Sequence, residues 1–346
     1  MPGPSAADVK NLASRCGFDL CGVAPAEDFD ELQFLREWIA RGYHGEMHYM
    51  ERTAEGRADV RAVLPSARSV IVLGTLYNTP HLGSTGKDQA TRASIARYAW
   101  GDDYHDVIQA RLTKLVKSIR DITGHFEHRA YVDTGPIQER VYAQYAGLGW
   151  IGKNTCLING DLGSWLFLSA IICDLALDPD TRALEHCGRC TLCIDSCPTG
   201  ALREPYHLDA RRCLSYLTIE NKGPIPVEYR PALGAHAYGC DICQEVCPWN
   251  RRDAVSNDPA WQPRAGLHAP RLLDLWQQRD DELRHLLKGS PMKRAGVRRL
   301  RRNLAVSVGN SGDPEAAAAL EGSREETSLD PLVREHVKWA VEQLDG

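Results

Sequence analysis

Eight of the twelve cysteines in this 346-residue sequence lie within residues 187–247. The first run, Cys187–Pro198, has the spacing C-x2-C-x2-C-x3-C-P. The run Cys240–Pro248 repeats its second half and follows an isolated Cys213. A 4Fe–4S cluster needs four thiolates that converge on one cube. Two-residue gaps let a tight loop supply three of them, and the cysteine before proline reaches the other cluster of a pair. The spacing therefore predicts two 4Fe–4S clusters.

Reciprocal pairing between the runs divides these cysteines into two ligand sets. The first set is Cys187, Cys190, Cys193 and Cys247, and the second is Cys197, Cys213, Cys240 and Cys243. Structural zinc sites also use C-x2-C pairs, but they rarely combine three cysteines in successive steps with two C-P endings. The cysteines outside the segment are interpreted as small buried hydrophobic residues: Cys16, Cys21, Cys156 and Cys173.

Asp133 ends a predicted strand, residues 129–132, and begins the turn Asp-Thr-Gly-Pro, in which Pro136 suits the first turn of a helix. From position alone, a turn or capping carboxylate is the simpler interpretation. The functional alternative is a proton donor beside a redox cofactor. A partly buried carboxylic acid there could have a raised pKa and release its proton during reduction.

The segment 291–302 contains six basic residues and no acidic one. On a helical wheel its apolar side is formed by Val297, Leu300, Leu304 and Val308. The basic residues are expected opposite it or at its flanks: Lys293, Arg294, Arg298, Arg299, Arg301 and Arg302. A solvated helix face usually mixes both signs of charge. A cluster of one sign on an acidic protein is more typical of a phosphate-binding surface, which favours nucleic acid as the partner.

The elements that must position these residues suggest an α+β protein in three parts. Residues 1–180 combine predicted strands, such as 69–76 and 164–173, with a helix at about 104–120. Residues 181–255 carry the cysteines, and residues 256–346 form a helical tail that resembles a short stack of paired helices. Residues 147–154 nearly match a phosphate-binding loop. However, Asn154 replaces the required hydroxyl residue and a helix precedes the motif, so nucleotide hydrolysis is rejected.

The composition is that of an ordinary soluble protein, with 43% hydrophobic residues, 25% charged residues and a formal net charge of −5. The first residues do not have the pattern of a signal peptide, and the longest apolar stretch is too short to span a bilayer. Cysteines in such a chain are not expected to form disulfides. We therefore expect a cytoplasmic protein without a membrane partner.

Ordered motifs along nearly the whole chain resemble those of the epoxyqueuosine reductases, which act on tRNA. They include both cysteine runs, the segments 17–25, 64–70, 100–105, 133–136, 149–154 and 213–220, and the pairs Lys293-Arg294 and Arg302-Asn303. The resemblance implies an oxidoreductase of queuosine biosynthesis. Such an enzyme reduces the epoxide of epoxyqueuosine at the tRNA wobble position to queuosine, with electrons passing from the two clusters to cobalamin. It also implies a nitroreductase-like first domain, a ferredoxin-like two-cluster domain and a HEAT-like tail.

The same resemblance implies roles for individual residues. Asp133 would protonate the leaving epoxide oxygen. Cobalamin would be contacted by Arg57, Ala96, Asp133, Leu157, Ser215 and Asp241. The tRNA would be contacted by Asn221, Lys222, Lys293, Arg294, Arg298, Arg299 and Arg302. A monomer served by a separate electron donor is expected.

Two other functions share parts of this pattern. A cobalamin-dependent reductive dehalogenase would have similar clusters but no reason for a basic helical tail. A ferredoxin-type electron carrier or corrinoid activator would bind no tRNA. The histidine motif D-x-H-x-x-G of many cobalamin proteins is absent, because Ile108 stands where its glycine belongs after Asp103 and His105. The resembling family binds cobalamin without that histidine.

Overall fold

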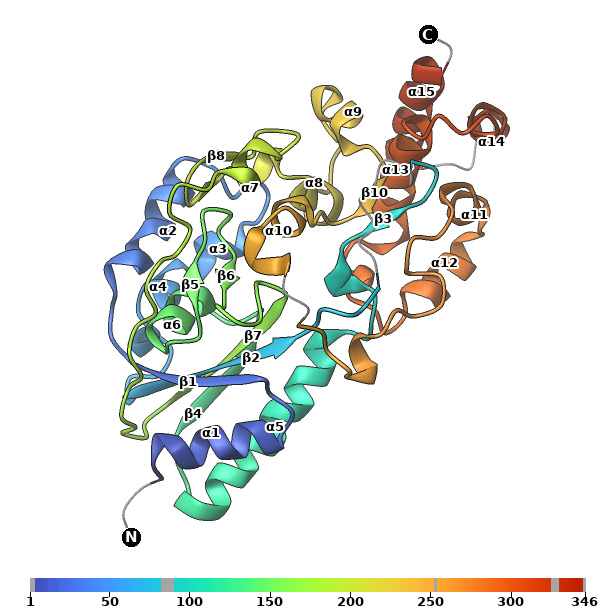
Figure 1. The fold of residues 1–346 in the computed structure, drawn as a ribbon. Coiled ribbons are helices and arrows are strands. Elements are labelled where there is room, and N and C mark those ends of the chain that lie inside the picture. The colour runs from blue at the N-terminus through green and yellow to red at the C-terminus, as the bar shows by residue number, and fades with distance from the viewer. Residues whose placement is uncertain (1–3, 82–89, 252–253, 325–329, 345–346) are drawn as a thin grey trace.

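The computed structural model describes residues 4–81, 90–251, 254–324 and 330–344 (Figure 1). Its centre is a four-stranded antiparallel sheet in the order β1-β2-β7-β4. These strands are β1 (Leu20–Pro25), β2 (Ser69–Leu76), β7 (Leu166–Cys173) and β4 (His128–Val132). The six other strands form two-stranded sheets. Strand β3 (Ser94–Ile95) pairs with the distant β10 (His236–Tyr238), β5 (Trp150–Ile151) pairs with β6 (Leu157–Ile158), and β8 (Leu202–Glu204) pairs with β9 (His207–Leu208).

Helices cover both faces of the central sheet. Ile71 and Ile171 lie in register and face α1 (Ala6–Arg15) and α5 (Tyr104–Thr123), whereas their neighbours Val72 and Ala170 face the opposite layer. That layer contains α2 (Asp30–Ala40) and α6 (Glu139–Tyr145), with the short α3 (Tyr49–Arg52) and α4 (Ala54–Ala58) nearby (Figure 1). Both faces are buried because successive side chains of a strand point to opposite sides. The predicted mixture of helix and sheet is confirmed.

Local sequence signals explain where several elements begin and end. Ser5 and Asp8 form a capping box at α1, and the Asp103 side chain accepts a hydrogen bond from the His105 amide at the start of α5. Helix α6 begins at Glu139, so the prediction that Pro136 occupies its first turn is wrong. Residues 133–138 form a connection without helix or strand geometry between β4 and α6, and this connection carries Asp133.

The cysteine segment and the tail contain mostly short helices. In the former these are α7 (Leu192–Asp195), α8 (Leu214–Ile219), α9 (Arg230–Leu233) and α10 (Ile242–Glu245). In the latter they are α11 (Leu272–Gln277), α12 (Asp280–Leu287), α13 (Gly296–Gly309), α14 (Ala316–Arg324) and α15 (Pro331–Leu344). Helix α13 packs against β10, α8, α11 and α15, so it lies inside the tail and not along its edge.

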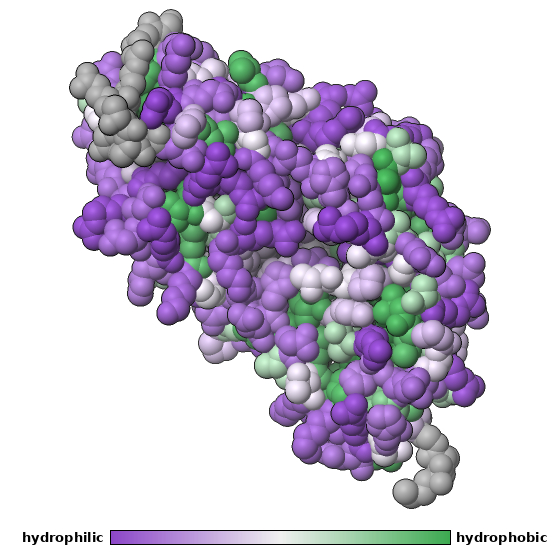
Figure 2. All heavy atoms as spheres, turned by 180° about the vertical axis from the view of Figure 1, so that it is seen from behind, coloured by the Kyte–Doolittle hydropathy of each residue, from purple (hydrophilic) through white to green (hydrophobic). Residues whose placement is uncertain are grey.

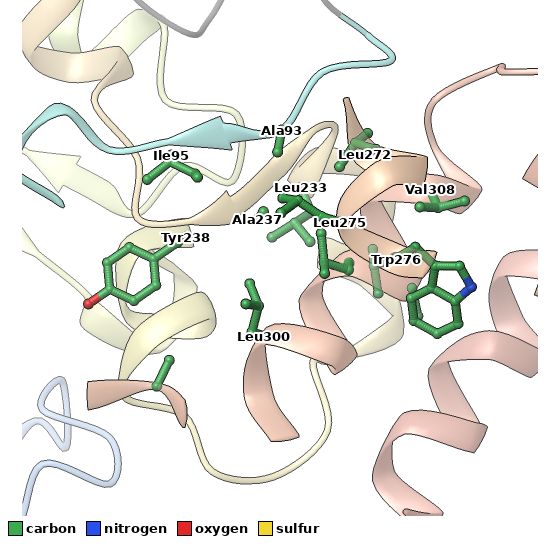
Figure 3. Close-up of a cluster of buried hydrophobic side chains, with 14 of the residues drawn as sticks. Ala93, Ile95, Leu233, Ala237, Tyr238, Leu272, Leu275, Trp276, Leu300 and Val308 are labelled. Carbon is green, nitrogen blue, oxygen red and sulfur yellow. The ribbon is translucent and has the colours of Figure 1, made fainter. Parts of the chain in front are cut away.

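One hydrophobic cluster joins all three predicted parts of the chain. Strand β3 pairs in parallel with β10, and both pack against α11 and α13 (Figure 3). Ile95, Tyr238 and Leu300 are each at most 1% exposed in this cluster. The boundaries expected near residues 180 and 255 therefore do not separate independent hydrophobic cores.

The back of the molecule is covered mainly by hydrophilic side chains, with separate small apolar patches between them (Figure 2). Among the described residues, none of the helices combines the length and apolar character needed to cross a bilayer.

Candidate functional site

One cavity is lined by all four cysteines of the first predicted ligand set. Cys187 and Cys190 come from the loop that leads into α7, Cys193 lies in α7 itself, and Cys247 follows α10. The Lys153 ammonium donates hydrogen bonds to the carbonyls of Gly188 and Cys190, which fixes this loop against residues 150–158. Burial, followed by the charges of Cys187 and Cys247, raises the pKa of Cys193 to about 11. Burial also raises the pKa values of Cys187 and Cys247. Neighbouring thiols that resist ionisation together are suited to a cationic iron–sulfur core, which would relieve that repulsion.

The second predicted set is also brought together. Burial raises the pKa of Cys240 well above its ordinary value, and interactions with Cys213 and Cys197 add to the shift. Cys243 interacts electrostatically with Cys240 and Cys213. The Cys197 sulfur accepts a hydrogen bond from the Ala201 amide at 3.2 Å. Amide donors of this kind stabilise the negative charge of a cluster ligand.

Sequence reasoning missed Cys156. This residue, interpreted as a small hydrophobe, shares a hydrogen bond between its thiol and that of Cys243, a predicted ligand of the second cluster. Its neighbour Asn154 donates to the Cys243 carbonyl at 3.3 Å. No spacing rule marks a single cysteine 31 positions before the first run, so only the fold could reveal this contact.

Asp133 lies at the carboxyl end of β4 with φ of 58°, a conformation that residues other than glycine adopt infrequently. Its Oδ2 accepts a hydrogen bond from the Tyr104 hydroxyl at 2.8 Å and lies 3.5 Å from His105 Nε2. Partial burial alone would raise the pKa of Asp133, but the hydrogen bond from Tyr104 and the close approach of His105 outweigh it and lower the pKa from its ordinary value. The expectation of a raised pKa is therefore wrong for the protein without substrate, and the carboxyl group does not cap α6.

His105 links Asp133 to a second, buried carboxylate. Its Nδ1 lies 2.8 Å from Asp103 Oδ1, and Asp103 is 2% exposed. The other oxygen of Asp103 lies 2.6 Å from the Lys293 ammonium, which comes from the tail. These residues form a continuous chain of contacts from the tail to Asp133. No motif or spacing in the sequence predicts that these residues contact one another.

Four of the six predicted cofactor contacts, namely Ala96, Leu157, Ser215 and Asp241, lie near the cysteines of the second set. The Arg97 amide, next to Ala96, donates to Asp241 Oδ2 at 2.6 Å. Gly239 lies so close to Ala96 that a Cβ on the glycine would be 2.5 Å from the alanine Cβ. The Gly239 amide in turn donates to Thr218, on the helix that carries Ser215. Leu157, next to Cys156, is buried in β6.

Arg57 lies against the connection that carries Asp133. Its guanidinium donates to the Ile137 carbonyl at 2.8 Å and to Thr53 at 2.9 Å. Nearby, Glu139 Oε1 is buried without a hydrogen-bond partner among the described residues. Burial and the charge of Asp133 raise the pKa of Glu139 to about 8. An unsatisfied buried oxygen of this kind suits a ligand that carries amide donors, as a corrinoid does.

The tail does not present the basic face that the helical wheel predicted. Arg302 is 0% exposed and donates to the carbonyls of Leu217, Asn221 and Gly223, so its predicted contact with tRNA is wrong. Helix α13 packs against neighbouring elements on several sides, and residues 302–309 are buried all around its axis.

The other basic residues of the segment pair with acids or carbonyls from distant parts of the chain. Arg294 forms a bidentate pair with Glu220, and Arg298 pairs with Asp330 at 2.8 Å. Arg299 is partly buried and donates to the Ile219 carbonyl. The positive charge of this segment is therefore balanced by acidic residues from other parts of the chain.

Asn221 and Lys222 differ in their availability. The Asn221 residue is 8% exposed, and its side chain forms hydrogen bonds with Gly223 and Pro224 of its own turn. The prediction that Asn221 contacts tRNA is therefore wrong. The Lys222 amide donates to Glu46 at 2.8 Å, and its side chain is exposed. Lys222 remains a candidate contact.

Comparisons with known proteins bear on the whole chain. A family model described as "4Fe-4S double cluster binding domain" matches residues 186–250, and one described as "Epoxyqueuosine reductase QueG, DUF1730" matches residues 57–134. The epoxyqueuosine reductase of Xanthomonas campestris pv. campestris is 42% identical over 346 residues, which cover 99% of this chain and 97% of that protein.

Solved structures are similar over the same extent. A crystal structure of epoxyqueuosine reductase with an epoxyqueuosine-modified tRNA-Tyr stem loop superimposes with a TM-score of 0.90 at 29% identity, covering 98% of this chain and 90% of that one. Epoxyqueuosine reductase from Bacillus subtilis, solved with its catalytic aspartate loop swung out of the active site, gives a TM-score of 0.87 at 27% identity with the same coverage.

Proposed function

Because the chain belongs to the epoxyqueuosine reductase family, we infer that it reduces the epoxide of epoxyqueuosine at the wobble position of tRNA, giving queuosine. The observation that best supports this proposal is that the fold brings three groups of residues together. These are two converged sets of cysteines, the connection that carries Asp133, and an Arg57 that packs against the same connection.

Two 4Fe–4S clusters would be held by the two cysteine sets. Cys187, Cys190, Cys193 and Cys247 line one cavity and fit one cluster. Cys197, Cys213, Cys240 and Cys243 fit the other. When bound, the clusters supply a path for single electrons from a separate donor protein or a chemical reductant.

Cobalamin would be held by the backbone near Ala96, Leu157, Ser215 and Asp241, beside the second cysteine set, and by Arg57 and Asp133. When bound, cobalamin supplies the reducing metal centre that opening an epoxide requires. The unpartnered oxygen of Glu139 would accept a hydrogen bond from one of its amide side chains.

Asp133 would hold and release the proton for the leaving oxygen of the substrate. Its carboxylate is fixed by Tyr104 and His105, and it lies in a connection without helix or strand geometry between β4 and α6. The catalytic aspartate loop described for the Bacillus subtilis enzyme supports this role, since a residue on such a connection can move relative to the sheet.

The tRNA would lie across the surface around Lys222 and the exposed side of the segment 293–299. Lys293, Arg294 and Arg298 are exposed but ion-paired, and Arg299 is partly buried. A phosphate would therefore have to compete with carboxylates of this chain for their cations. Lys222 carries no such carboxylate partner on its ammonium among the contacts of the described residues, so we expect it to contribute most.

The finer architecture follows the same proposal. Residues 1–180 would form a nitroreductase-like cobalamin-binding domain, residues 181–255 a ferredoxin-like domain, and residues 256–346 a HEAT-like tail. The enzyme would act as a monomer in the cytoplasm, because the tRNA itself supplies a large partner surface.

The test is an anaerobic incubation of the purified protein with cobalamin, a chemical reductant and tRNA that contains epoxyqueuosine. Nucleosides are then analysed by mass spectrometry. We expect a product that lacks one oxygen and forms only when cobalamin is present. The absence of this product from protein with full iron and cobalamin content would contradict the proposed function.

Asp133→Asn is the matched variant, because it keeps the size of the side chain but cannot supply a carboxylic proton. We expect conversion to fall by about 10²-fold or more, which is the usual contribution of a positioned general acid. The spectra of clusters and cobalamin should stay unchanged. Near-normal conversion by this variant would refute the role of Asp133 as the acid.

A further inference from the structure

His105 is held between two carboxylates in a fixed orientation. Its ring nitrogens lie 2.8 Å from Asp103 Oδ1 and 3.5 Å from Asp133 Oδ2. The Tyr104 ring stacks on the imidazole at 4.0 Å between ring centroids and on Phe167 at 4.4 Å. The buried Asp103 is itself held by Lys293. An imidazole fixed on one side by a buried carboxylate has its other nitrogen aimed at a single target, Asp133.

The proton of this pair resides on the histidine. Burial opposes the charged form of His105, but the hydrogen bond to Asp103 and the nearby charges of Asp103 and Asp133 outweigh it and raise the pKa to about 9. The pKa of Asp133 is lowered. At neutral pH the pair is therefore an imidazolium and a carboxylate. Asp133 can act as an acid from this state only after it receives a proton.

The chemistry of the proposed function, on which this inference rests, requires such a supply. Removing an epoxide oxygen breaks two C–O bonds, forms one C=C bond and releases the oxygen as water. This conversion consumes two electrons and two protons. The electrons come from the reductant through the clusters. Both protons must reach the same oxygen, and a carboxylate at Asp133 carries neither of them.

We propose that His105 is the positioning residue that supplies protons to Asp133, and that Asp103 and Lys293 hold it for this task. The proton on Nε2 passes to Asp133 Oδ2 and from there to the leaving oxygen. The imidazole ring, which is 29% exposed although Nε2 itself is buried, is then protonated again, and the same route delivers the second proton. The structure supplies a donor and a relay in one line of contacts.

Other ionisable groups surround the pair and affect how a pH profile is interpreted. Interactions reach Asp133 from Tyr104 on α5 and Arg294 beside α13, and Asp133 in turn affects Tyr49, Tyr98 and Glu139. Among these groups of the described chain, Glu139, with a pKa raised to about 8, also titrates near neutral pH. Variants of His105 are therefore needed to assign the profile.

The experiment measures single-turnover conversion by the cobalamin-loaded enzyme from pH 5.5 to pH 9.5, with dithionite in excess so that electron supply does not limit the rate. The wild-type rate should fall above about pH 9, where His105 loses its proton. His105→Gln should lower the rate at pH 7 by about 10²-fold. In that variant the rate should rise as the pH falls, because Asp133 must then take its proton from solvent.

A second variant separates proton supply from structure. His105→Gly leaves space for free imidazole, and we expect added imidazole to restore conversion in a saturable manner that follows the pKa of substituted imidazoles. His128→Gln is the matched control, since His128 is a half-buried histidine on β4 outside the described contact chain, and its pH profile should equal that of the wild type.

A measurement that does not depend on turnover completes the test. Carbon-13 NMR of labelled histidine in the oxidised holoprotein, assigned with His105→Gln, should give a pKa near 9. A value at or below the ordinary 6.5 would overturn the proposal, as would a His105→Gln enzyme with wild-type rate and pH profile. Wild-type protein that does not convert the substrate would instead contradict the proposed function and this inference together.

Discussion

Replacing Arg302 with methionine should destabilise the fold and leave the salt dependence of tRNA binding unchanged. The guanidinium donates to the carbonyl oxygens of Leu217, Asn221 and Gly223 at 2.6–2.8 Å, and to Asn303 Oδ1. It is 0% exposed, and burial lowers the pKa of Arg302 to about 9. At neutral pH it therefore remains charged and satisfies the end of α8 and the turn that follows.

The size of the effect follows from the acceptors that lose their donor. Methionine keeps most of the aliphatic volume, so the change mainly leaves three backbone carbonyls and one side-chain carbonyl without partners. Each buried unsatisfied group costs about 1–3 kcal/mol. Part of this loss in stability is offset, because the variant no longer has to bury a charge. We expect a net loss of about 3 kcal/mol in the free energy of unfolding.

The assay is anaerobic urea denaturation of the holoprotein, followed by tRNA binding at several salt concentrations. Arg298→Met is the matched control, because Arg298 lies on the same helix with a half-exposed pair to Asp330 and should contribute about 0–1 kcal/mol. The reasoning is refuted if both variants have equal stability, or if Arg302→Met lowers the slope of log K against log salt by about 1.

Two further predictions concern pH and the RNA surface. His336 donates from Nδ1 to the Leu332 carbonyl and accepts at Nε2 from the Ile225 amide, and burial lowers its pKa from 6.5 to about 4. The unfolded chain therefore binds a proton that the folded protein does not, so the stability contributed by a neutral His336 is complete above pH 6.5 and is lost as the pH falls towards 4. Denaturation at pH 7.5 and pH 5 should show this loss in the wild type and a smaller one in His336→Gln; equal losses would contradict it. For the RNA surface, Lys222→Ala should lower the salt slope of tRNA binding by about 1, whereas Lys117→Ala on the exposed side of α5 should not change it, and equal slopes for both would remove Lys222 from the interface.

The cysteine ligand sets could be predicted from the sequence because their geometry is local. Two-residue gaps and a following proline constrain the backbone within a few positions of each cysteine. The structure accordingly places Cys247 in the same cavity as Cys193, although 53 residues lie between these two cysteines. The strands of the central sheet could be predicted for a similar reason, since runs such as 69–76 are buried on both faces.

Charge and contact across the fold could not be predicted in this way. A helical wheel assumes that only one side of a helix is buried, but α13 is enclosed by β10, α8, α11 and α15. Arg302 is therefore buried, although the wheel predicts that it is exposed. The low pKa of Asp133 depends on His105, and the environment of His105 depends on Lys293 from the tail. Each of these contacts joins residues that no periodicity or spacing relates.

The pairing of β3 with β10 has a consequence for the order in which the protein is made. Ser94 and Ile95 leave the ribosome about 140 residues before His236 and Tyr238, and α13 follows later still. The strand pair and its hydrophobic cluster therefore cannot form until most of the chain has been synthesised. Cys240, two residues after β10, gains its fixed position in the same late step. The first set is completed later still, by Cys247, so the two iron–sulfur clusters cannot both be assembled in full until the chain has been made beyond residue 247.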